Sequence, residues 1–429
     1  MNCTRLFQNI YLRKMSNRTP LYAALDAPGA SRRYLVAVFM AGALLRIGIC
    51  FFTALPNMHK DSFEYFRQAD TLLAGGYTDY FPNGYPLLIA LVKALSPAHT
   101  QGILLWIQIG MSVSTIAFVY DIGRRLSGYS VYGLLAALIL AVFPSQINYV
   151  RWLTTETPTA FFLLGAFFFY FRKQWFWCGI FLGMATLVRS NVSPVFILLF
   201  LAHFIHTRKL PLTLVAATLL PLLLIGSYCY MKTGKFSTAG NNQINILYSV
   251  TASGPDIDFG LGKKFPEVNT TGKALHMYVD HMKTEPFVFI RQKLANLWEL
   301  WGFYASSANG GRSVGSRLLL GAGNFFLLTL GLFGWWRHRK NYRVSILILP
   351  FAVVTVLHTF LFAMPRYTYP VEPFMILLAA WALLDLAGPP PVAKPSGPPD
   401  SHPTDSHPAD SHPTDSHPAE SPARPSAIA

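Results

Sequence analysis

Charged residues are scarce in this sequence. Asp, Glu, Lys and Arg together make up 13% of its 429 residues, whereas hydrophobic residues make up 52%. Since a soluble globular protein carries roughly a quarter charged residues, this balance excludes an ordinary soluble enzyme and indicates a membrane protein. The apolar segments also lack the alternating pattern of strands. Because the backbone must satisfy its own hydrogen bonds in lipid, a helical bundle follows.

Cysteine is scarce too. The four cysteines, Cys3, Cys50, Cys178 and Cys229, have no partners at a metal-like spacing. None of them falls in the long external loop that we place at residues 232–317. The sequence therefore supports neither a zinc site nor a disulfide framework.

The sequence is rich in apolar blocks of about 20 residues, the length that spans a hydrocarbon core of about 30 Å. We therefore predict an all-α integral membrane protein with about ten transmembrane helices, to within about one or two. The candidate spans, three of them short, are Tyr34–Leu55, Gly102–Tyr120, Val131–Val150, Pro158–Phe171, Trp175–Val188, Pro194–His206, Pro211–Met231, Leu318–Trp336, Val344–Phe362 and Tyr369–Leu386.

The net charge of +15 comes largely from basic residues that flank these spans. They precede the first span and occupy short loops at Arg124–Arg125, Arg172–Lys173, Arg208–Lys209 and 337–343. If the N-terminus is cytoplasmic, all of these loops lie in the cytoplasm, as the positive-inside rule requires. An even number of crossings returns the C-terminus there, so we expect both termini in the cytoplasm and the bacterial inner (plasma) membrane as the location. Topology thus accounts for the charge, which argues against a nucleic-acid partner.

By composition the chain divides into a basic N-terminal segment (1–33), a transmembrane domain (34–387) and a tail (388–429). The transmembrane domain contains two external loops, at 56–101 and 232–317. The tail repeats Asp-Ser-His-Pro and cannot bury a core, so we predict that it is disordered. Its histidines could hold a metal loosely, but a low-complexity tail is the simpler interpretation.

The first external loop concentrates carboxylates, at Asp61, Glu64, Asp70 and Asp79. Residues 61–74 are predicted to form an amphipathic helix that ends at a Gly-Gly pair. The residues expected near its apolar face are Phe63, Phe66, Ala69, Leu72 and Leu73.

Two further external helices are predicted. The segment Tyr85–Leu95 is too short to span the membrane, so we interpret it as a re-entrant or interfacial helix. In the second external loop, Pro286–Tyr304 is rich in Trp and apolar residues on one face, which is typical of a helix lying at the membrane interface. The residues on that face are Phe287, Ile290, Leu294, Leu297, Trp298 and Trp301.

The carboxylates at the outer membrane boundary are the candidates for chemistry. Asp61 could act as a general base that accepts a proton from an acceptor hydroxyl, or it could merely cap its helix. Glu156, at the outer mouth of a span, could face the same cavity or cap its helix through Thr154 or Thr157.

Basic residues fall on the same side. Arg189 and Arg366 could bind a phosphate bidentately or snorkel at helix ends, and Lys60 is also available to a phosphate. His358 lies inside a span and is interpreted as a packed, hydrogen-bonded histidine. His276 and His281 share a loop without a ligand spacing.

The order of these motifs resembles that of the GT-C class glycosyltransferases, closest to family 39, which includes protein O-mannosyltransferases and aminoarabinose transferases of lipid A. The resemblance covers roughly 34–386. It is carried by Asp61-Ser-Phe-Glu-Tyr65, Gly75-Gly76, Gly84-Tyr-Pro-Leu-Leu88, Phe143-Pro144 before Glu156, Gly183-Met-Ala-Thr-Leu-Val-Arg189-Ser, Gly234-Lys-Phe-Ser-Thr-Ala-Gly-Asn-Asn and Arg366-Tyr367.

The resemblance implies an inverting transfer of a sugar from a polyprenyl-phosphate donor to a hydroxyl of a lipid, protein or glycan acceptor. It places Asp61 as the base, Glu156 as the second acidic residue, and Arg189 and Arg366 near the lipid phosphate. We expect the substrate cavity to be lined by Tyr65, Tyr85 and Tyr367.

One departure from the family concerns metal binding. Many relatives carry Asp-Glu where this chain has Asp61-Ser62. A divalent cation such as Mg²⁺ is compatible with the resemblance, but no ligand cluster in the sequence supports one.

Two other classes share parts of this pattern. A transporter or lipid flippase also has many spans, but it tends to place ionisable residues at mid-bilayer and to show inverted repeats. Here only Arg46 and His358 lie deep in spans. A polymerase or ligase of surface polysaccharide shares the lipid-linked donor but relies on basic residues rather than an early Asp.

Overall fold

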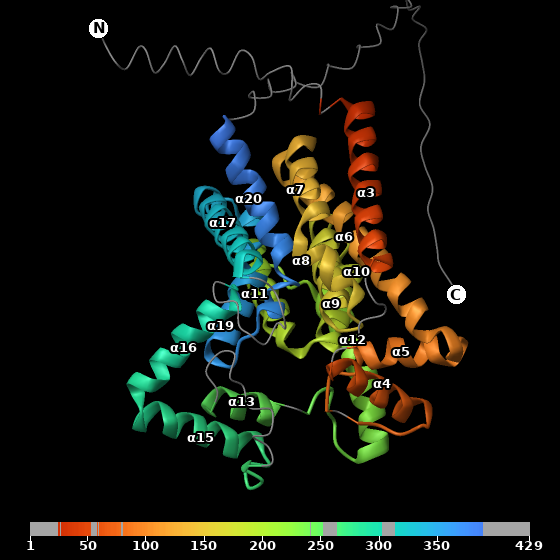
Figure 1. Cartoon of the computed structure of the whole chain (residues 1–429), viewed down its shortest axis with the longest axis vertical. Coiled ribbons are helices and arrows are strands. Elements are labelled where there is room, and N and C mark those ends of the chain that lie inside the picture. Colours follow the sequence, from red (N-terminus) through yellow and green to blue (C-terminus); the bar gives the residue numbers. More distant parts are fainter. Residues whose placement is uncertain are drawn as a thin grey trace, which may run out of the picture. The chain divides into compact units, whose positions relative to one another are not determined.

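The computed structural model is helical throughout the part of the chain that it describes (Figure 1), namely residues 25, 27–52, 58, 60–78, 80–240, 242–251, 264–302 and 314–388. Most of the predicted basic N-terminal segment, Asp79, the side chain of Lys60 and the repeat tail lie outside the described residues.

The helices follow the apolar blocks closely. They are α3 (Pro28–Phe51), α4 (Lys60–Leu73), α5 (Gly84–Leu95), α6 (Thr100–Ser127), α7 (Ser130–Val142), α8 (Pro144–Asn148), α9 (Glu156–Phe171), α10 (Trp175–Val188), α11 (Ser193–Thr207), α12 (Leu212–Thr233), α13 (Asn242–Thr251), α15 (Thr271–Thr284), α16 (Pro286–Leu300), α17 (Val314–His338), α18 (Tyr342–Ser345), α19 (Ile348–Phe360) and α20 (Glu372–Ala387).

By length and apolar composition, five helices of the described residues can cross a membrane, and a sixth if the bent pair formed by α7 and the turns after it is one span. Shorter apolar helices, α5, α9 and α10, accompany them. The prediction of an all-α integral membrane protein is confirmed, whereas the number of about ten spans stays a prediction.

The bend after α7 explains one of the two ionisable residues deep in a span. Pro144 lacks a backbone N–H, and the pair of helices is bent there by 56°. The carbonyl oxygens of Leu140 and Ala141, left without helical partners, accept hydrogen bonds from the guanidinium of Arg46 at 3.3 and 3.0 Å. Arg46 also donates from Nε to Ser112 Oγ at 2.8 Å. Arg46 therefore stabilises a break in the bundle, which is not the role expected of a transporter's mid-bilayer charge.

Contacts at one end of the bundle join elements that precede or follow the predicted basic loops. Arg172 Nη2 lies 3.1 Å from Asp121 Oδ1. Tyr170 Oη lies 2.9 Å from His203 Nδ1 and 2.7 Å from Tyr342 Oη. The ends of α6, α9 and α11 and the start of α18 therefore lie together, as alternating spans require. In Figure 1, α3 and α20 reach the upper end of the bundle, whereas α4, α5, α13, α15 and α16 lie at the lower end.

The first external helix is α4, and its buried face differs from the prediction. The residues that face the protein are Ser62, Tyr65, Gln68 and Ala69, whereas Phe63 is 62% exposed. The predicted face is therefore partly right: Ala69 is buried and Phe66 and Leu72 pack against the core, but Phe63 and Leu73 are exposed. Polar Ser62 and Gln68 are buried instead, and Gln68 Nε2 donates to the carbonyls of Thr78 and Phe81. The helix ends before Gly75, which has φ +75°, a conformation that favours glycine.

The second external helix, α5, has 12 residues. At about 18 Å in length, it is too short to cross the bilayer. It is joined to α4 by an ion pair between Lys93 and Asp70.

Several polar residues of helix α16 are buried, and most of its large apolar side chains are exposed. Lys293, Asn296 and Glu299 are buried, and Asn296 Nδ2 donates to the carbonyls of Thr359 and Leu361 at the end of α19. The exposed side chains are Phe287, Val288, Ile290, Leu294, Leu297 and Trp298. The predicted face is confirmed except for Trp301, which is buried. An apolar exposed face is typical of a helix in contact with lipid.

A spin label at position 294 tests this orientation. With the native cysteines replaced by alanine and the protein in nanodiscs, we expect a label on Leu294→Cys to be accessible to oxygen and shielded from a water-soluble nickel chelate. A label on Lys283→Cys, an exposed residue of α15, is the control and should be open to nickel. Equal nickel accessibility at the two positions contradicts contact with lipid.

Lys293 makes stability depend on pH. Its Nζ donates to the Ser249 carbonyl at 2.9 Å and lies 4.7 Å from the centre of the Phe289 ring. Burial lowers the pKa of Lys293 from 10.5 to about 8. Between these values the unfolded chain holds a proton that the folded chain has lost, so stability rises with pH in this window. Thermal unfolding in nanodiscs should show this rise in the wild type and a smaller one in Lys293→Met, with exposed Lys283→Met as the control. Identical slopes in all three contradict it.

Candidate active site

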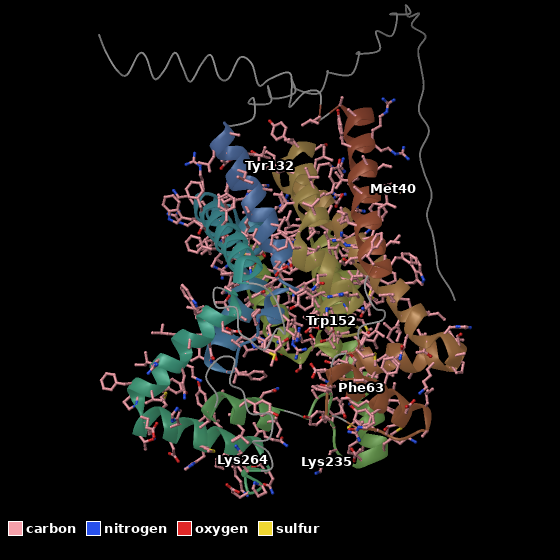
Figure 2. All side chains as sticks on the ribbon, in the orientation of Figure 1. Met40, Phe63, Tyr132, Trp152, Lys235 and Lys264 are labelled. Atoms are coloured by element: carbon pink, nitrogen blue, oxygen red, sulfur yellow. The ribbon has the colours of Figure 1, made fainter. Side chains whose placement is uncertain are left out.

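Four charged side chains from four elements meet near the end of the bundle opposite the basic loops. Asp61 comes from α4, Glu156 from the start of α9, Arg189 from the end of α10, and Arg366 from the turn Pro365–Thr368. Arg366 Nη2 lies 2.7 Å from Asp61 Oδ2, and Arg366 Nε lies 3.7 Å from Glu156 Oε1. Arg189 Nη2 lies 3.2 Å from the same Glu156 oxygen. The structure thus brings together the four residues that the sequence placed at the outer boundary. Figure 2 labels Phe63 of α4 and Trp152, which precedes Glu156, toward this end, and Tyr132 of α7 toward the other.

Local structure explains how the carboxylates are presented. Glu156 is the first residue of α9, where the helix dipole favours negative charge. The N-cap residue Thr155 makes no side-chain capping bond, whereas a side-chain hydrogen bond with Thr154 helps to lower the pKa of the Glu156 carboxyl. The alternative that Glu156 caps the helix through Thr154 or Thr157 therefore stays a prediction. Asp61 lies inside the first turn of α4, which begins at Lys60, and its carboxylate contacts Arg366 instead of serving as the cap that precedes the helix.

The electrostatics of the cluster favour ionised groups. Glu156 is 1% exposed. Burial alone would raise the pKa of its carboxyl, but Arg189 and Arg366 outweigh burial, and the net shift is downward. Burial lowers the pKa of Arg366, but the carboxylates of Glu156 and Asp61, with Tyr367 beside them, raise it well above its ordinary value. Two carboxylates and two guanidinium groups therefore balance one another, as buried charges must.

Tyr367 lies against both arginines. The centre of its ring is 4.9 Å from Arg189 Cζ and 5.6 Å from Arg366 Cζ, distances at which a cation is attracted to an aromatic face. The centre of the His358 ring lies 4.3 Å from the centre of the Tyr367 ring. His358 Nδ1 lies 3.0 Å from the Phe362 carbonyl, and its Nε2 lies 2.7 Å from Asn191 Nδ2. The interpretation of His358 as a packed, hydrogen-bonded histidine is confirmed.

The other two tyrosines predicted to line the cavity, Tyr65 and Tyr85, are buried next to the charged cluster. Tyr65 is 5% exposed and contacts Tyr85 edge to face, with ring centres 5.5 Å apart. Tyr85 is fully buried, and its hydroxyl donates to Gln108 Oε1 at 3.0 Å. Tyr85 therefore does not line a substrate cavity: the prediction was wrong because the start of α5 faces α6 and α10.

Arg189 has a buried donor without a hydrogen-bond partner among the described residues. Arg189 Nη1 is buried and makes no hydrogen bond to any residue that the structure describes. The other terminal nitrogen of Arg189, Nη2, donates to Glu156 Oε1. Arg189 can therefore donate to an anionic ligand without breaking its ion pair.

A divalent cation does not fit this arrangement. The guanidinium of Arg366 contacts both carboxylates and so occupies the region between them. No group of three His, Cys, Asp or Glu side chains suited to a metal occurs in the described part of the chain. We therefore derive no step that uses a metal.

Sequence reasoning missed Gln108, Asn191 and Glu372. Glu372 begins α20, is 4% exposed, and accepts hydrogen bonds from Ser145 and Gln146 just after the bend at Pro144. A carboxylate at the start of an apolar block was the signal that could have identified it. The other two are uncharged, and nothing in their local sequence distinguishes them.

Comparison with known proteins gives one match to a family model and a likeness to a solved structure. Residues 82–228 match the family model described as dolichyl-phosphate-mannose-protein mannosyltransferase. The resemblance to the GT-C glycosyltransferases is confirmed. The matched segment includes Glu156 and Arg189, but Asp61 and Arg366 lie outside it.

A solved structure is similar over most of this chain: an archaeal oligosaccharyltransferase, AglB from Archaeoglobus fulgidus, in complex with an inhibitory peptide and a dolichol-phosphate. The identity is 14% and the TM-score 0.45, and the alignment covers 83% of this chain and 50% of that one. The chain thus spans about half the length of that protein. Curated protein sequences give no significant match.

Proposed function

We propose that this protein is an inverting membrane glycosyltransferase that moves a sugar from a polyprenyl-phosphate donor to an acceptor hydroxyl on the non-cytoplasmic face. The observation that carries the proposal is the cluster of Asp61, Glu156, Arg189 and Arg366, which combines a carboxylate base with phosphate-binding cations. The description of the matched family names a lipid-phosphate-linked mannose, which supports the donor class. The sugar and the acceptor, whether lipid, protein or glycan, are left open.

The proposed reaction assigns tasks to Asp61, Arg189 and Arg366. The donor phosphate binds Arg189 through the unused Nη1 and competes with Asp61 for Arg366. Asp61, released from the ion pair, takes the proton of the acceptor hydroxyl as its oxygen attacks the anomeric carbon. The bond from that carbon to the phosphate oxygen breaks, and the electron pair leaves with the polyprenyl phosphate. Both arginines stabilise the negative charge on that leaving group.

The competing classes fit the structure less well. Arg46, deep in a span, caps the broken helix α7, so it offers no free charge for a transport path. A polymerase or ligase shares the lipid-linked donor but relies on basic residues rather than an early Asp, and the identity of the product also separates it from the other transferases. The proposal includes a location in the bacterial inner membrane with both termini in the cytoplasm.

A transfer assay tests the proposal. Purified protein in nanodiscs is incubated with a panel of labelled polyprenyl-phosphate sugars and a membrane extract as acceptor. We expect one donor to yield a labelled acceptor together with free polyprenyl phosphate in equal amounts. If every donor remains intact while labelled lipid moves between the leaflets of a vesicle containing the protein, the flippase alternative replaces the transferase.

A further inference from the structure

The Gly84-Tyr85-Pro86 motif at the start of α5 is buried. It nevertheless touches the elements that carry the charged residues. A Cβ atom at Gly84 would lie 2.6 Å from the carbonyl carbon of Leu187 and 2.7 Å from the backbone nitrogen of Val188. Only glycine allows α5 to begin this close to the last turn of α10, next to Arg189.

Tyr85 is connected through Gln108 to the segment that leads to Glu156. Its hydroxyl donates to Gln108 Oε1 at 3.0 Å. Gln108 Nε2 donates in turn to the carbonyls of Val150 and Trp152, at 3.0 and 2.8 Å. The side chains of Tyr85 and Gln108 are fully buried. Since carbonyls only accept, the amide of Gln108 is held with its NH₂ group toward the segment 150–152.

That segment is the irregular chain between the bend at Pro144 and the start of α9. The Trp152 carbonyl also accepts from the backbone N–H of Thr154 at 2.8 Å, which forms a tight turn four residues before Glu156. Removing Gln108 would take this donor from the buried Val150 carbonyl and one of its hydrogen bonds from the Trp152 carbonyl. Gln108 therefore holds the turn from which Glu156 emerges.

Tyr85 also supports the other carboxylate. Its ring contacts that of Tyr65, with centres 5.5 Å apart. Tyr65 lies four residues after Asp61, on the same face of α4. One buried side chain thus contacts the helix of the proposed base and, through Gln108, the turn that delivers Glu156.

We infer that Tyr85 and Gln108 are positioning residues, which set the separation of Asp61 and Glu156 across the site. The inference rests on the proposed function, since only there is Asp61 the base and Glu156 the partner of the phosphate-binding arginines. Neither residue touches the substrate, and both act through the backbone of α4 and of residues 150–156.

Kinetics of Tyr85→Phe, Gln108→Leu and the double variant test the inference. For transfer from a lipid-phosphate sugar we expect kcat to fall about 10- to 100-fold, with the KM for the donor changed less than about twofold because both arginines remain. The double variant should be no slower than Gln108→Leu, since both changes break one chain of contacts. The controls are Gln101→Leu, an exposed glutamine of the same helix α6, and Tyr80→Phe, an exposed tyrosine of the same loop. An unchanged kcat in folded Gln108→Leu and Tyr85→Phe, or additive losses in the double variant, overturns the inference.

Hydrogen exchange gives a readout that does not depend on transfer. In Gln108→Leu we expect the amide of Thr154 to exchange at least about tenfold faster than in the wild type, with the amides of α9 beyond its first turn unchanged. Unchanged exchange at Thr154 overturns the inference. If the wild type transfers no sugar, the proposed function fails, and the exchange result still decides whether Gln108 holds this turn.

Discussion

Replacing Asp61 with asparagine is expected to lower kcat for sugar transfer by about 10²- to 10⁴-fold, the usual contribution of a general base. Asparagine has nearly the same shape and can still accept a hydrogen bond from Arg366 through its amide oxygen. It cannot take up the proton of the acceptor hydroxyl at neutral pH. The loss should therefore appear in kcat while the protein still folds.

The matched control for this prediction is Asp70→Asn, on the same helix. Asp70 is exposed and pairs with Lys93 at the surface, so its replacement should change kcat by less than about twofold. Rates would be measured with saturating labelled donor, and folding by thermal unfolding in nanodiscs. Wild-type activity in Asp61→Asn refutes the assignment of this residue as the base.

Replacing Arg189 with glutamine is expected to lower kcat by about 10²- to 10³-fold, the cost of removing one donor from the charge that develops in a transition state. The unused Nη1 of Arg189 is the proposed contact of the departing phosphate. Because Arg189 is also an ion-pair partner of Glu156, the single variant leaves a buried carboxylate with less compensation and loses about 3–5 kcal/mol of stability at most.

A double variant separates the two effects. In Arg189→Gln with Glu156→Gln, the uncompensated charge is removed and thermal stability should recover, whereas transfer should stay slow. Arg291→Gln, an exposed arginine of the external helix α16, should change neither property. Recovery of transfer together with stability would show that Arg189 serves the fold and does not bind the phosphate.

The resemblance to known transferases, rather than residue type, singled out Asp61, Glu156, Arg189 and Arg366 as site residues. From residue type alone, a helix cap explained Asp61 better than a catalytic role did, and snorkelling explained the arginines equally well. What distinguishes the functional interpretation is that all four side chains converge, at distances of 2.7 to 3.7 Å. No spacing along the chain encodes this convergence, since Asp61 and Arg366 lie near opposite ends of the transmembrane domain.

Two errors in the sequence analysis have one cause. Hydrophobic periodicity assigned Phe63 to the buried face of α4, and the position of its motif assigned Tyr85 to the substrate cavity. Both assignments assume that each helix faces water on one side. In a membrane protein apolar side chains can face lipid, and polar ones such as Gln68 and Gln108 are buried where carbonyls accept their hydrogen bonds. Periodicity then no longer reports which side of a helix faces inward.

The sequence by itself determined that the chain is a helical membrane protein, where most of its apolar helices lie, and which loops carry the basic residues. These properties are local: a long apolar block in lipid must satisfy its backbone within the block, whatever its neighbours are. Only the tertiary structure decided which side chains meet. Rotation of each helix about its axis and the break at Pro144 place Glu156 and Arg189 beside Asp61 and Arg366, and these depend on packing between segments that the local sequence does not record.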